Sequence, residues 1–270
     1  MVTVFTPTYN RKNSLKFLYE SLKRQTDMDF QWIVVDDGSQ DGTNQYIESL
    51  KGDAPFEIKY RYVENGGKMR AINIGVSISD GEFFFIVDSD DFVTNDAIEK
   101  IKKYGATLPK DMGGMAFRKM NRVDGVVTGK PFPQHIIDST PLEIVYKRGI
   151  IGDKAEVFRT EILRKYPFRV YDGEKFIPEA LVWMKIGTQH KIRYIDEGIY
   201  YFEYLPDGYT KNFTKLIKNN PKGFREYYKE MLKYELPLTN KIKFLLRFLQ
   251  AEFYILTGGT KWRYCTWLHR

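Results

Sequence analysis

The sequence predicts an α/β protein with a mostly parallel sheet and helices on both of its faces. Three observations lead to this fold class. Strand-like and helix-like segments alternate four times over residues 2–104. With 270 residues, of which 43% are hydrophobic, the chain can bury a full core. Each predicted strand also ends in polar, charged or glycine-containing sequence, so that such residues gather at one edge of the sheet.

The predicted elements follow in a regular order. The first strand leads into an amphipathic helix, and three further strand and helix pairs repeat the pattern. The fourth strand includes FFFIV at residues 83–87, a run apolar enough to be buried on both faces. The strands are predicted at 2–6, 31–35, 57–63 and 82–87, and the helices at 13–24, 42–50, 68–77 and 95–104.

The carboxyl ends of the four strands predict a ligand site. They read TPTYN, DDGSQDGT, ENGGKMR and DSDD, and they meet at the edge where open α/β sheets bind ligands. The acids from the second and fourth strands join Lys68 and Arg70 from the third connection. Carboxylates beside cations suit a ligand that carries phosphates and a divalent metal.

The fourth strand end suggests a metal site. Asp88 and Asp90 are two residues apart, so in extended chain both carboxylates point to one side and can share a hard cation. Left unpaired, the two carboxylates would raise each other's pKa and destabilise the fold. The alternative is a turn followed by a helix N-cap, formed by Asp91, Thr94 and Asn95.

Composition narrows the function classes. The single Cys265 excludes an intrachain disulfide and a cysteine-based zinc site, and His135, His190 and His269 lack metal-ligand spacing. A reducing compartment fits this composition. Residues 1–10 pass into a strand pattern without the features of a secretory signal, so a cytoplasmic location is expected.

Charge is concentrated towards the C-terminus. Residues 206–270 hold 13 Lys and Arg against 5 Asp and Glu, whereas residues 1–205 hold 29 against 30. A nucleic-acid binder would suit basic charge with many aromatics. The aromatics do not form RNA-binding platforms, however, and the expected nucleotide site is acidic, so no nucleic-acid partner is predicted.

Four linked motifs resemble the nucleotide-sugar domain of family 2 glycosyltransferases, which have the GT-A fold. The motifs are PTYNR at 7–11, VVDDGSQDGT at 34–43, NGGKMRAINIG at 65–75 and GEFFFIVDSDD at 81–91. Two later segments, at 151–163 and 174–183, resemble more loosely the acceptor side of bacterial non-processive members. The resemblance implies a Rossmann-like GT-A core with a C-terminal helical extension.

The resemblance also implies roles for individual residues. A UDP-sugar would lie with its base in a pocket, its phosphates beside cations and its diphosphate on Mn²⁺ or Mg²⁺. Taken alone, each residue also suits a turn, a packing position or a solvated helix start. The implied assignments are Pro7, Thr8 and Tyr9 for the base pocket, Asp37 for the base edge, Asp36 for loop support, Lys68 and Arg70 for the phosphates, Asp88 with Ser89 for the ribose side, Asp90 (with Asp88) for the metal, and Asp91 for orienting the sugar.

The family's inverting chemistry requires a carboxylate base on the acceptor side. Glu179 is the first candidate, because Pro178 is predicted to open a helix through Ile186 that aims Glu179 at the cleft. The family usually has Glu-Asp here and favours the Asp, whereas this chain has Ala180. Asp153 is the reserve candidate, and a dipole-favoured position at a helix N-terminus is the alternative role for Glu179.

Three regions are expected: a nucleotide-sugar core at 1–120, an acceptor-binding part at 121–205 and a basic helical tail at 206–270. The aromatic run at 194–204 suits either sugar stacking or a half-buried strand, and the strand is favoured. Residues 238–256 carry too much charge to span a bilayer and predict a surface helix. This tail, with Trp262 and Trp267, is expected either to contact the inner face of the membrane, to pack on the core or to form a homodimer.

The function expected is a metal-dependent, inverting glycosyltransferase. It would move a sugar from a UDP-sugar to a hydroxyl of a glycan acceptor, carried on a lipid, in bacterial surface polysaccharide synthesis. Two alternatives remain from other classes. One is a sugar-phosphate nucleotidylyltransferase, although TPTYNR replaces its glycine-rich signature. The other is an inactive relative that only binds nucleotide-sugar or glycan.

Overall fold

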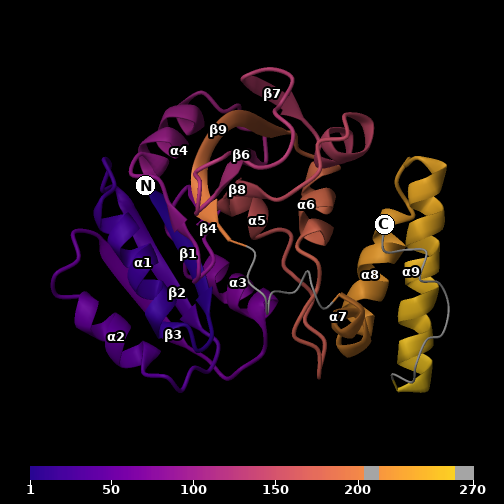
Figure 1. Cartoon of the computed structure of the whole chain (residues 1–270), viewed down its shortest axis with the longest axis horizontal. Coiled ribbons are helices and arrows are strands. Elements are labelled where there is room, and N and C mark those ends of the chain that lie inside the picture. Colours follow the sequence, from indigo (N-terminus) through magenta and orange to yellow (C-terminus); the bar gives the residue numbers. More distant parts are fainter. Residues whose placement is uncertain (204–212, 259–270) are drawn as a thin grey trace. The chain divides into compact units, whose positions relative to one another are not determined.

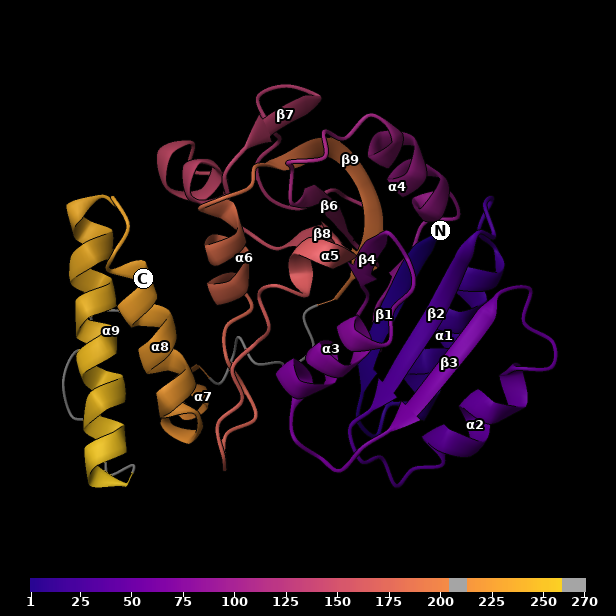
Figure 2. The same cartoon turned by 180° about the vertical axis from the view of Figure 1, so that it is seen from behind.

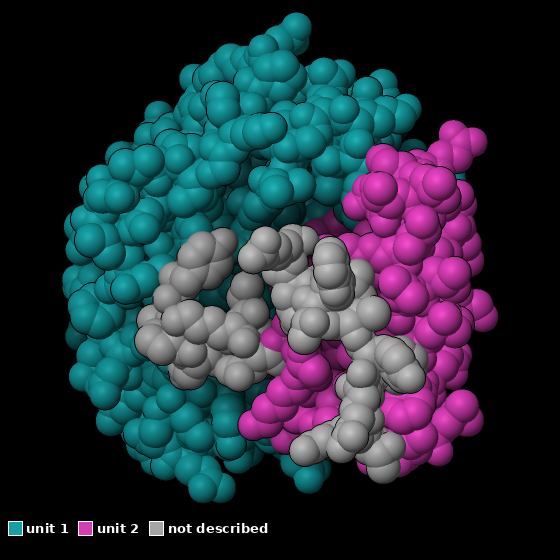
Figure 3. Space-filling model, turned by 45° about the vertical axis from the view of Figure 1, so that its right-hand side comes forward, with its two compact units in different colours: residues 1–167, 184–203 teal, residues 168–183, 204–270 magenta. Residues whose placement is uncertain are grey.

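The computed structural model describes residues 1–203 and 213–258 (Figure 1). The chain divides into two compact units, shown in different colours in Figure 3. The first unit comprises residues 1–167 and 184–203, and the second comprises residues 168–183 and the chain from residue 204 onwards.

The first unit contains one mixed sheet, and its parallel part comes from the start of the chain. β1 pairs with β2 on one side and with β4 on the other, and β3 pairs with β2, all in parallel. The predicted alternation of strands and helices is therefore confirmed, with most ends within two residues of those expected. The strands are β1 (Val2–Thr8), β2 (Phe30–Asp36), β3 (Glu57–Tyr62) and β4 (Phe83–Ile86).

The rest of the sheet comes from later segments. β8 pairs antiparallel with both β4 and β6, and β6 pairs in parallel with β9, so β4, β6 and β9 end at the same edge. β5 and β7 pair antiparallel with different halves of β9. These strands are β5 (Phe92–Val93), β6 (Gly114–Asn121), β7 (Ile136–Ser139), β8 (Lys154–Arg159) and β9 (Ile192–Phe202).

Helices cover both faces of the sheet (Figures 1 and 2). On one face, buried side chains of α1, α2 and α4 form a core with Val2, Val4 and Trp32. On the other face α3 packs against β1, where Gly75 lets the two backbones approach. A Cβ on Gly75 would lie 2.1 Å from Cε2 of Phe5. The helices of this unit are α1 (Lys12–Lys23), α2 (Thr43–Leu50), α3 (Lys68–Ser77), α4 (Ala97–Ala106), the π-helix η1 (Glu143–Lys147) and α5 (Thr160–Leu163), with α6 (Ala180–Gly187) crossing the unit boundary.

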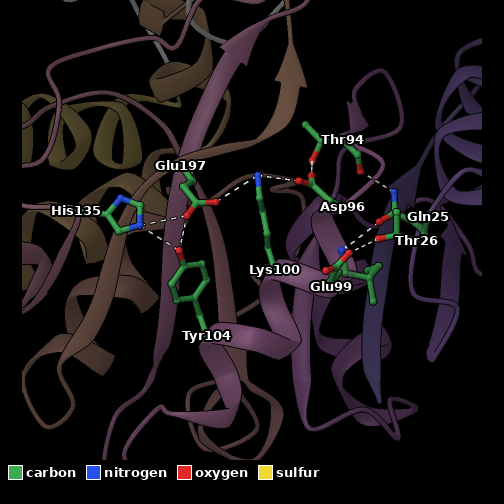
Figure 4. Close-up of polar contacts among 10 residues, drawn as sticks. Gln25, Thr26, Thr94, Asp96, Glu99, Lys100, Tyr104, His135 and Glu197 are labelled. Atoms are coloured by element: carbon green, nitrogen blue, oxygen red, sulfur yellow. Dashed lines mark hydrogen bonds and ion pairs between the residues drawn. The ribbon is translucent and has the colours of Figure 1, made fainter.

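A polar network joins α4 to β9 (Figure 4). The Lys100 ammonium lies 2.9 Å from Asp96 Oδ2 and 3.2 Å from Glu197 Oε2. The other oxygen of Glu197 accepts a hydrogen bond from the Tyr104 hydroxyl and lies 3.2 Å from Nε2 of His135. Charge-assisted bonds therefore fix the position of α4 on the strand that carries Glu197.

The favoured prediction for the aromatic run at 194–204 is confirmed as far as the chain is described. Residues 192–202 form β9, in which Tyr194, Tyr200 and Phe202 are buried and Tyr201 is half-buried. Tyr204 lies outside the described residues.

The second unit is built around a helix pair. Phe224 and Tyr228 of α8 contact the rings of neighbouring helices, with the Tyr228 and Phe244 ring centroids 5.8 Å apart. Glu174 caps α8, since its carboxylate accepts the backbone N–H groups of residues 222 and 223 at 2.8 and 2.9 Å. The helix predicted at 238–256 is confirmed as α9. The helices are α7 (Phe213–Asn219), α8 (Pro221–Met231) and α9 (Leu238–Thr257).

Residues 121–167 and 184–203 complete the sheet begun by residues 1–120, whereas residues 168–183 associate with the C-terminal helices. The division by role into 1–120, 121–205 and 206–270 stays a prediction. The tryptophans of the predicted membrane segment, Trp262 and Trp267, lie outside the described residues. Within residues 1–203 and 213–258, no helix is long and apolar enough to cross a bilayer.

Candidate active site

The candidate site lies at the carboxyl edge of the parallel strands. The chain builds outwards from β1 to β2 and β3, then places β4 on the opposite side of β1. This reversal marks the point where open α/β sheets bind ligands. Thr8, the last residue of β1, pairs with Asp36, the last residue of β2, so both strand ends deliver polar side chains to the same place.

Asp36 supports the loop after β2. It is fully buried, and its Oδ1 accepts the backbone N–H of Ser39 at 2.8 Å. Its Oδ2 accepts the hydroxyl of Tyr60 at 2.7 Å. Burial, and then the bond to Asp36, raises the pKa of Tyr60, so this hydroxyl stays protonated as a donor. These contacts agree with the loop-support role expected for Asp36.

Asp37 joins the loop after β2 to the loop after β3. Its two carboxylate oxygens accept the backbone N–H groups of Gly66 and Gly67 at 2.7 and 2.8 Å. Gly67 has a φ of 93°, a conformation that favours glycine. Each carboxylate oxygen retains a second acceptor position. The bond from Asp37 to a nucleotide base therefore stays a prediction.

The loops after β1 and β2 are also bonded to each other. The N–H of Asn10 donates to Ser39 Oγ, and Asn10 Oδ1 accepts the N–H of Gln40, both at 2.8 Å. Asn10 has a φ of 51°, a left-handed conformation that asparagine tolerates. Before it, the Tyr9 side chain is 51% exposed and available to a ligand.

Thr8 carries an unsatisfied hydroxyl. The residue is 3% exposed, and its Oγ1 has no hydrogen-bond partner among the described residues. A buried hydroxyl without a partner is unfavourable unless a ligand or water bonds to it. Pro7, the preceding residue, is buried in the sheet. Of the two, only Thr8 therefore has a polar side chain for a ligand.

The acidic loop after β4 is partly neutralised by the chain itself. The Lys68 ammonium lies 2.6 Å from Asp88 Oδ1. Burial acts to raise the pKa of Asp88, but the ammonium groups of Lys68 and Lys119 outweigh it and hold that pKa below its usual value. Lysines from two other elements therefore balance the charge of Asp88 in the folded chain, and its role beside the ribose stays a prediction.

Asp91 is held by a buried tyrosine. The Tyr200 hydroxyl donates to Asp91 Oδ2 at 2.7 Å and accepts the N–H of Asp88 at 3.0 Å. Burial, with repulsion from Asp88 and Asp90, raises the pKa of Asp91 to about 7 against the opposing effect of Lys119. The ammonium of Lys119 lies 4.0 Å from the centroid of the Tyr200 ring.

Asp90 differs from its neighbours. Its side chain is half-buried, and no hydrogen bond or ion pair to it occurs among residues 1–203 and 213–258. No group of three or more His, Cys, Asp or Glu side chains in the described part of the chain is placed to hold a metal. One carboxylate still fits Mg²⁺ or Mn²⁺, because such ions commonly take one or two protein carboxylates and complete their coordination with substrate phosphates and water.

The remaining predicted ligands of the phosphates and ribose lie close to these loops. Arg70 donates from Nη1 to the carbonyl oxygen of Glu64 at 3.3 Å and packs over Gly66. Lys68 is the first residue of α3. Ser89 is buried between the two acids of the loop. These placements leave the roles of Arg70 and Ser89 as predictions.

The two candidate bases lie in different units. Asp153 is exposed in the turn before β8, and the register of Phe85 with Val157 places the start of β8 beside the carboxyl end of β4. Glu179 belongs to the second unit. Its carbonyl oxygen accepts the N–H of Val182 at 2.9 Å, so the helix begins at Ala180 and Glu179 immediately precedes it. The choice of base stays a prediction.

Sequence reasoning missed Tyr60 and Lys119 as site residues, and it considered Tyr200 only within the aromatic run that could stack on sugars, not as the partner of the acidic loop. Tyr60 belongs to β3, Lys119 lies near the carboxyl end of β6, and Tyr200 lies near the carboxyl end of β9. The rule that strand ends carry the site would have found Lys119 and Tyr200 only if β6 and β9 had been assigned to this sheet.

A family model supports the resemblance seen in the motifs. The model described as glycosyl transferase family 2 matches residues 3–163. This range covers every strand of the site except β9.

Among curated proteins, the chain is similar to the poly(ribitol-phosphate) beta-N-acetylglucosaminyltransferase TarS of Staphylococcus aureus. The two are 24% identical over 261 residues, which cover 93% of this chain and 44% of TarS. Glycosyltransferase GlyA of Streptococcus pneumoniae is 29% identical over 201 residues, covering 74% of this chain and 28% of GlyA. The chain thus spans less than half the length of these two relatives.

Two solved structures show the same fold. TarS 1–349 in complex with UDP-GlcNAc superposes with a TM-score of 0.67 at 24% identity, covering 93% of this chain and 72% of that one. The mannosyltransferase PcManGT of Pyrobaculum calidifontis, in complex with GDP-Man and Mn²⁺, gives a TM-score of 0.61 at 19% identity, covering 96% and 70%. The expected fold class is confirmed.

Proposed function

The chain belongs to glycosyl transferase family 2, and we propose that it transfers a sugar from a nucleotide-sugar donor to a hydroxyl of a glycan acceptor. The observation that carries this proposal is the sheet edge where the strand order reverses. There, Thr8, the Asp36–Asp37 loop, Lys68 and the Asp88–Asp91 loop come together with a buried hydroxyl and one carboxylate left for a ligand. UDP-sugar is the proposed donor, supported by the similar TarS structure that holds UDP-GlcNAc.

The chain's own residues would bind the nucleotide in a preformed site. Asp37 holds the Gly66–Gly67 backbone, so the loops that flank the base and ribose are fixed before the donor arrives. The Thr8 hydroxyl would gain a hydrogen-bond partner from the donor. The Lys68 ammonium would contact a phosphate as well as Asp88. Arg70 would donate two hydrogen bonds to the phosphates.

We propose a divalent metal, Mn²⁺ or Mg²⁺, held by Asp90 together with the donor diphosphate. When bound, the metal supplies positive charge that stabilises the diphosphate as it departs. Asp88 would remain paired with Lys68 and face the ribose. Asp90 would therefore be the main metal ligand of the two acids. Asp91, fixed by Tyr200, would orient the sugar.

The proposed reaction inverts the anomeric carbon. The acceptor hydroxyl oxygen forms a bond to that carbon while the bond from the carbon to the diphosphate oxygen breaks, and a carboxylate takes the hydroxyl proton. Glu179 is the proposed base and Asp153 the reserve. Both are supported only by sequence position and by their place at the end of an element.

The acceptor is proposed to be a glycan carried on a lipid at the inner face of the cell membrane, in polysaccharide synthesis. The similarity to TarS, a poly(ribitol-phosphate) beta-N-acetylglucosaminyltransferase, supports a polymeric or polyol-rich acceptor. A cytoplasmic location with peripheral membrane contact follows from this proposal, and a homodimer stays a prediction.

Thermal shift with a panel of nucleotide-sugars tests the donor. UDP-, GDP-, CDP- and dTDP-sugars are each added with and without Mn²⁺. The proposal predicts the largest stabilisation from a UDP-sugar with Mn²⁺, because a ligand that binds only the folded state raises its stability. Stabilisation by GDP-mannose and by no other sugar of the panel would indicate a GDP-sugar donor instead of a UDP-sugar. Pyrophosphate release from a nucleoside triphosphate would instead indicate a nucleotidylyltransferase, and binding without transfer to any acceptor would indicate an inactive relative.

A further inference from the structure

One side of α9 presents an exposed apolar surface. Its side chains are 38–83% exposed although all are aliphatic. We call this surface the α9 outer face. Its residues are Leu238, Ile242, Leu245, Leu246, Leu249 and Leu256.

The opposite side of α9 is already used. Phe244, Arg247, Gln250, Ala251 and Tyr254 are buried, and α9 packs on α8 through this side. At 100° per residue these positions and the α9 outer face project to opposite sides of the helix. The outer face is therefore not the exposed margin of a core, and it runs the length of the 20-residue helix.

The charges around the α9 outer face are mainly positive. Lys241 and Lys243 flank Ile242 and project to either side of the face. Glu252 lies at the margin, where Arg225 of α8 approaches its carboxylate at 3.8 Å. Over residues 213–258 the chain carries 9 Lys and Arg against 4 Asp and Glu.

We propose that the α9 outer face lies in the interface of an anionic lipid bilayer. An apolar face with basic residues at its margins binds such a surface by burying aliphatic side chains below the headgroups while the ammonium groups stay among them. The inference rests on the peripheral membrane contact of the proposed function and names the surface that makes it, but it does not depend on the transfer reaction, because the contact involves neither donor nor acceptor.

A second copy of the chain suits this face less well. A two-helix seam is a narrow stripe with charged residues beside it. Here Leu246 widens the apolar surface beyond the stripe through Ile242, Leu245 and Leu249. Positions 248 and 253 hold half-buried phenylalanines where a seam would have polar residues. Two copies would also bring together surfaces of the same positive charge.

Vesicle co-sedimentation of the full chain tests the proposal. The vesicles are phosphatidylcholine alone and phosphatidylcholine with phosphatidylglycerol, and no nucleotide is added. Leu245→Ser with Leu249→Ser should weaken binding to the anionic vesicles about tenfold or more. Val123→Ser with Val126→Ser, two exposed apolar positions in a turn of the first unit, should leave it unchanged. Lys241→Ala with Lys243→Ala should reduce the preference for anionic lipid.

The same samples are measured for mass in solution by light scattering. Because the substituted leucines are exposed, melting temperatures should stay close to that of the wild type, which separates lost binding from lost folding. Failure of the wild type to bind anionic vesicles overturns the proposal. So does an oligomer that the leucine substitutions dissociate without any vesicle binding. Either failure leaves the proposed sugar transfer untouched.

Discussion

At the scale of single residues, the acidic loop owes its shape to a tyrosine that is remote in sequence. Tyr200 accepts the N–H of Asp88 and donates to Asp91, so one hydroxyl fixes both ends of the loop that contains Asp90. We predict that Tyr200→Phe lowers the free energy of unfolding by about 1–3 kcal/mol, because a buried N–H and a buried carboxylate each lose a partner. It should also weaken metal-dependent nucleotide binding.

Chemical denaturation and calorimetric titration check this prediction. Tyr201→Phe is the matched control, since Tyr201 is its half-buried neighbour on β9 and stacks on Phe92 with its ring. Equal stability and equal nucleotide affinity in wild type and Tyr200→Phe would show that Asp91 and the loop keep their positions without this hydroxyl.

The general base that takes the proton from the acceptor hydroxyl is proposed to be Glu179, with Asp153 as the reserve. We predict that Glu179→Gln retains UDP binding and the fold but loses sugar transfer by about 10²–10⁴-fold, the usual contribution of a general base. Asp153→Asn should transfer at close to the wild-type rate. Rate measurements at saturating donor distinguish the two variants. If Glu179→Gln transfers normally and Asp153→Asn does not, Asp153 takes the role.

Some residues of the site could be predicted from the sequence, whereas their hydrogen-bond partners could not. Asp36, Asp37, Asp88 and Asp90 follow directly from local sequence, because each lies at the end of a strand that its own neighbours specify. The partners of these acids do not follow. Whether Tyr200 reaches Asp91 depends on the pairing of β9 with β6 and β5, and these contacts are long-range.

At the scale of elements, α3 lies against β1 through a glycine. We predict that Gly75→Ala destabilises the fold by about 1–3 kcal/mol, because the added Cβ would lie 2.1 Å from the Phe5 ring in a packed core. Gly52→Ala is the control, since a Cβ there meets no atom within 4 Å. Urea denaturation of both variants measures the difference. Equal stabilities would mean that α3 shifts freely on the sheet.

The network between α4 and β9 predicts a pH dependence of stability. Burial acts to raise the pKa of Glu197, but hydrogen bonds from Tyr104 and Lys100 outweigh it, so the pKa lies below its usual value of 4.5. The stabilisation is therefore present above pH 4.5 and is lost as the pH falls through the lower, folded-state pKa. Glu197→Gln should lose stability at neutral pH and match the wild type at acid pH.

Thermal unfolding across this pH range, with exposed Glu235→Gln as the control, measures the effect. A Glu197→Gln variant whose deficit stays constant on acidification would assign the loss to packing rather than to the charge of Glu197.

The elements of residues 2–106 were predictable because each strand and helix has its own period and length. The strands of residues 114–202 were not all predictable. β8 runs antiparallel between two parallel strands, and β9 pairs with three different strands in turn. The order of these strands in the sheet depends on contacts between residues far apart in the sequence. The local periodicity of each strand does not contain that information.

At the scale of the whole molecule, the residues with proposed roles are distributed over two compact units. The first carries the acidic loop and the loops proposed to bind the nucleotide, and the second carries Glu179 and α9. The grouping of residues 168–183 with the C-terminal helices was not predicted, because it rests on side-chain contacts such as the Glu174 cap on α8. The surface helix was predicted correctly, since its amphipathic pattern is local.

Calorimetric titration of UDP into the wild type and Asp90→Ala, each with and without Mn²⁺, tests whether this sheet edge binds the donor and its metal. We predict that Mn²⁺ tightens UDP binding to the wild type by about tenfold or more and that Asp90→Ala loses this gain while it keeps its melting temperature. An undiminished Mn²⁺ effect in Asp90→Ala, or no UDP binding by the wild type, would contradict the assignment of this sheet edge as the donor site.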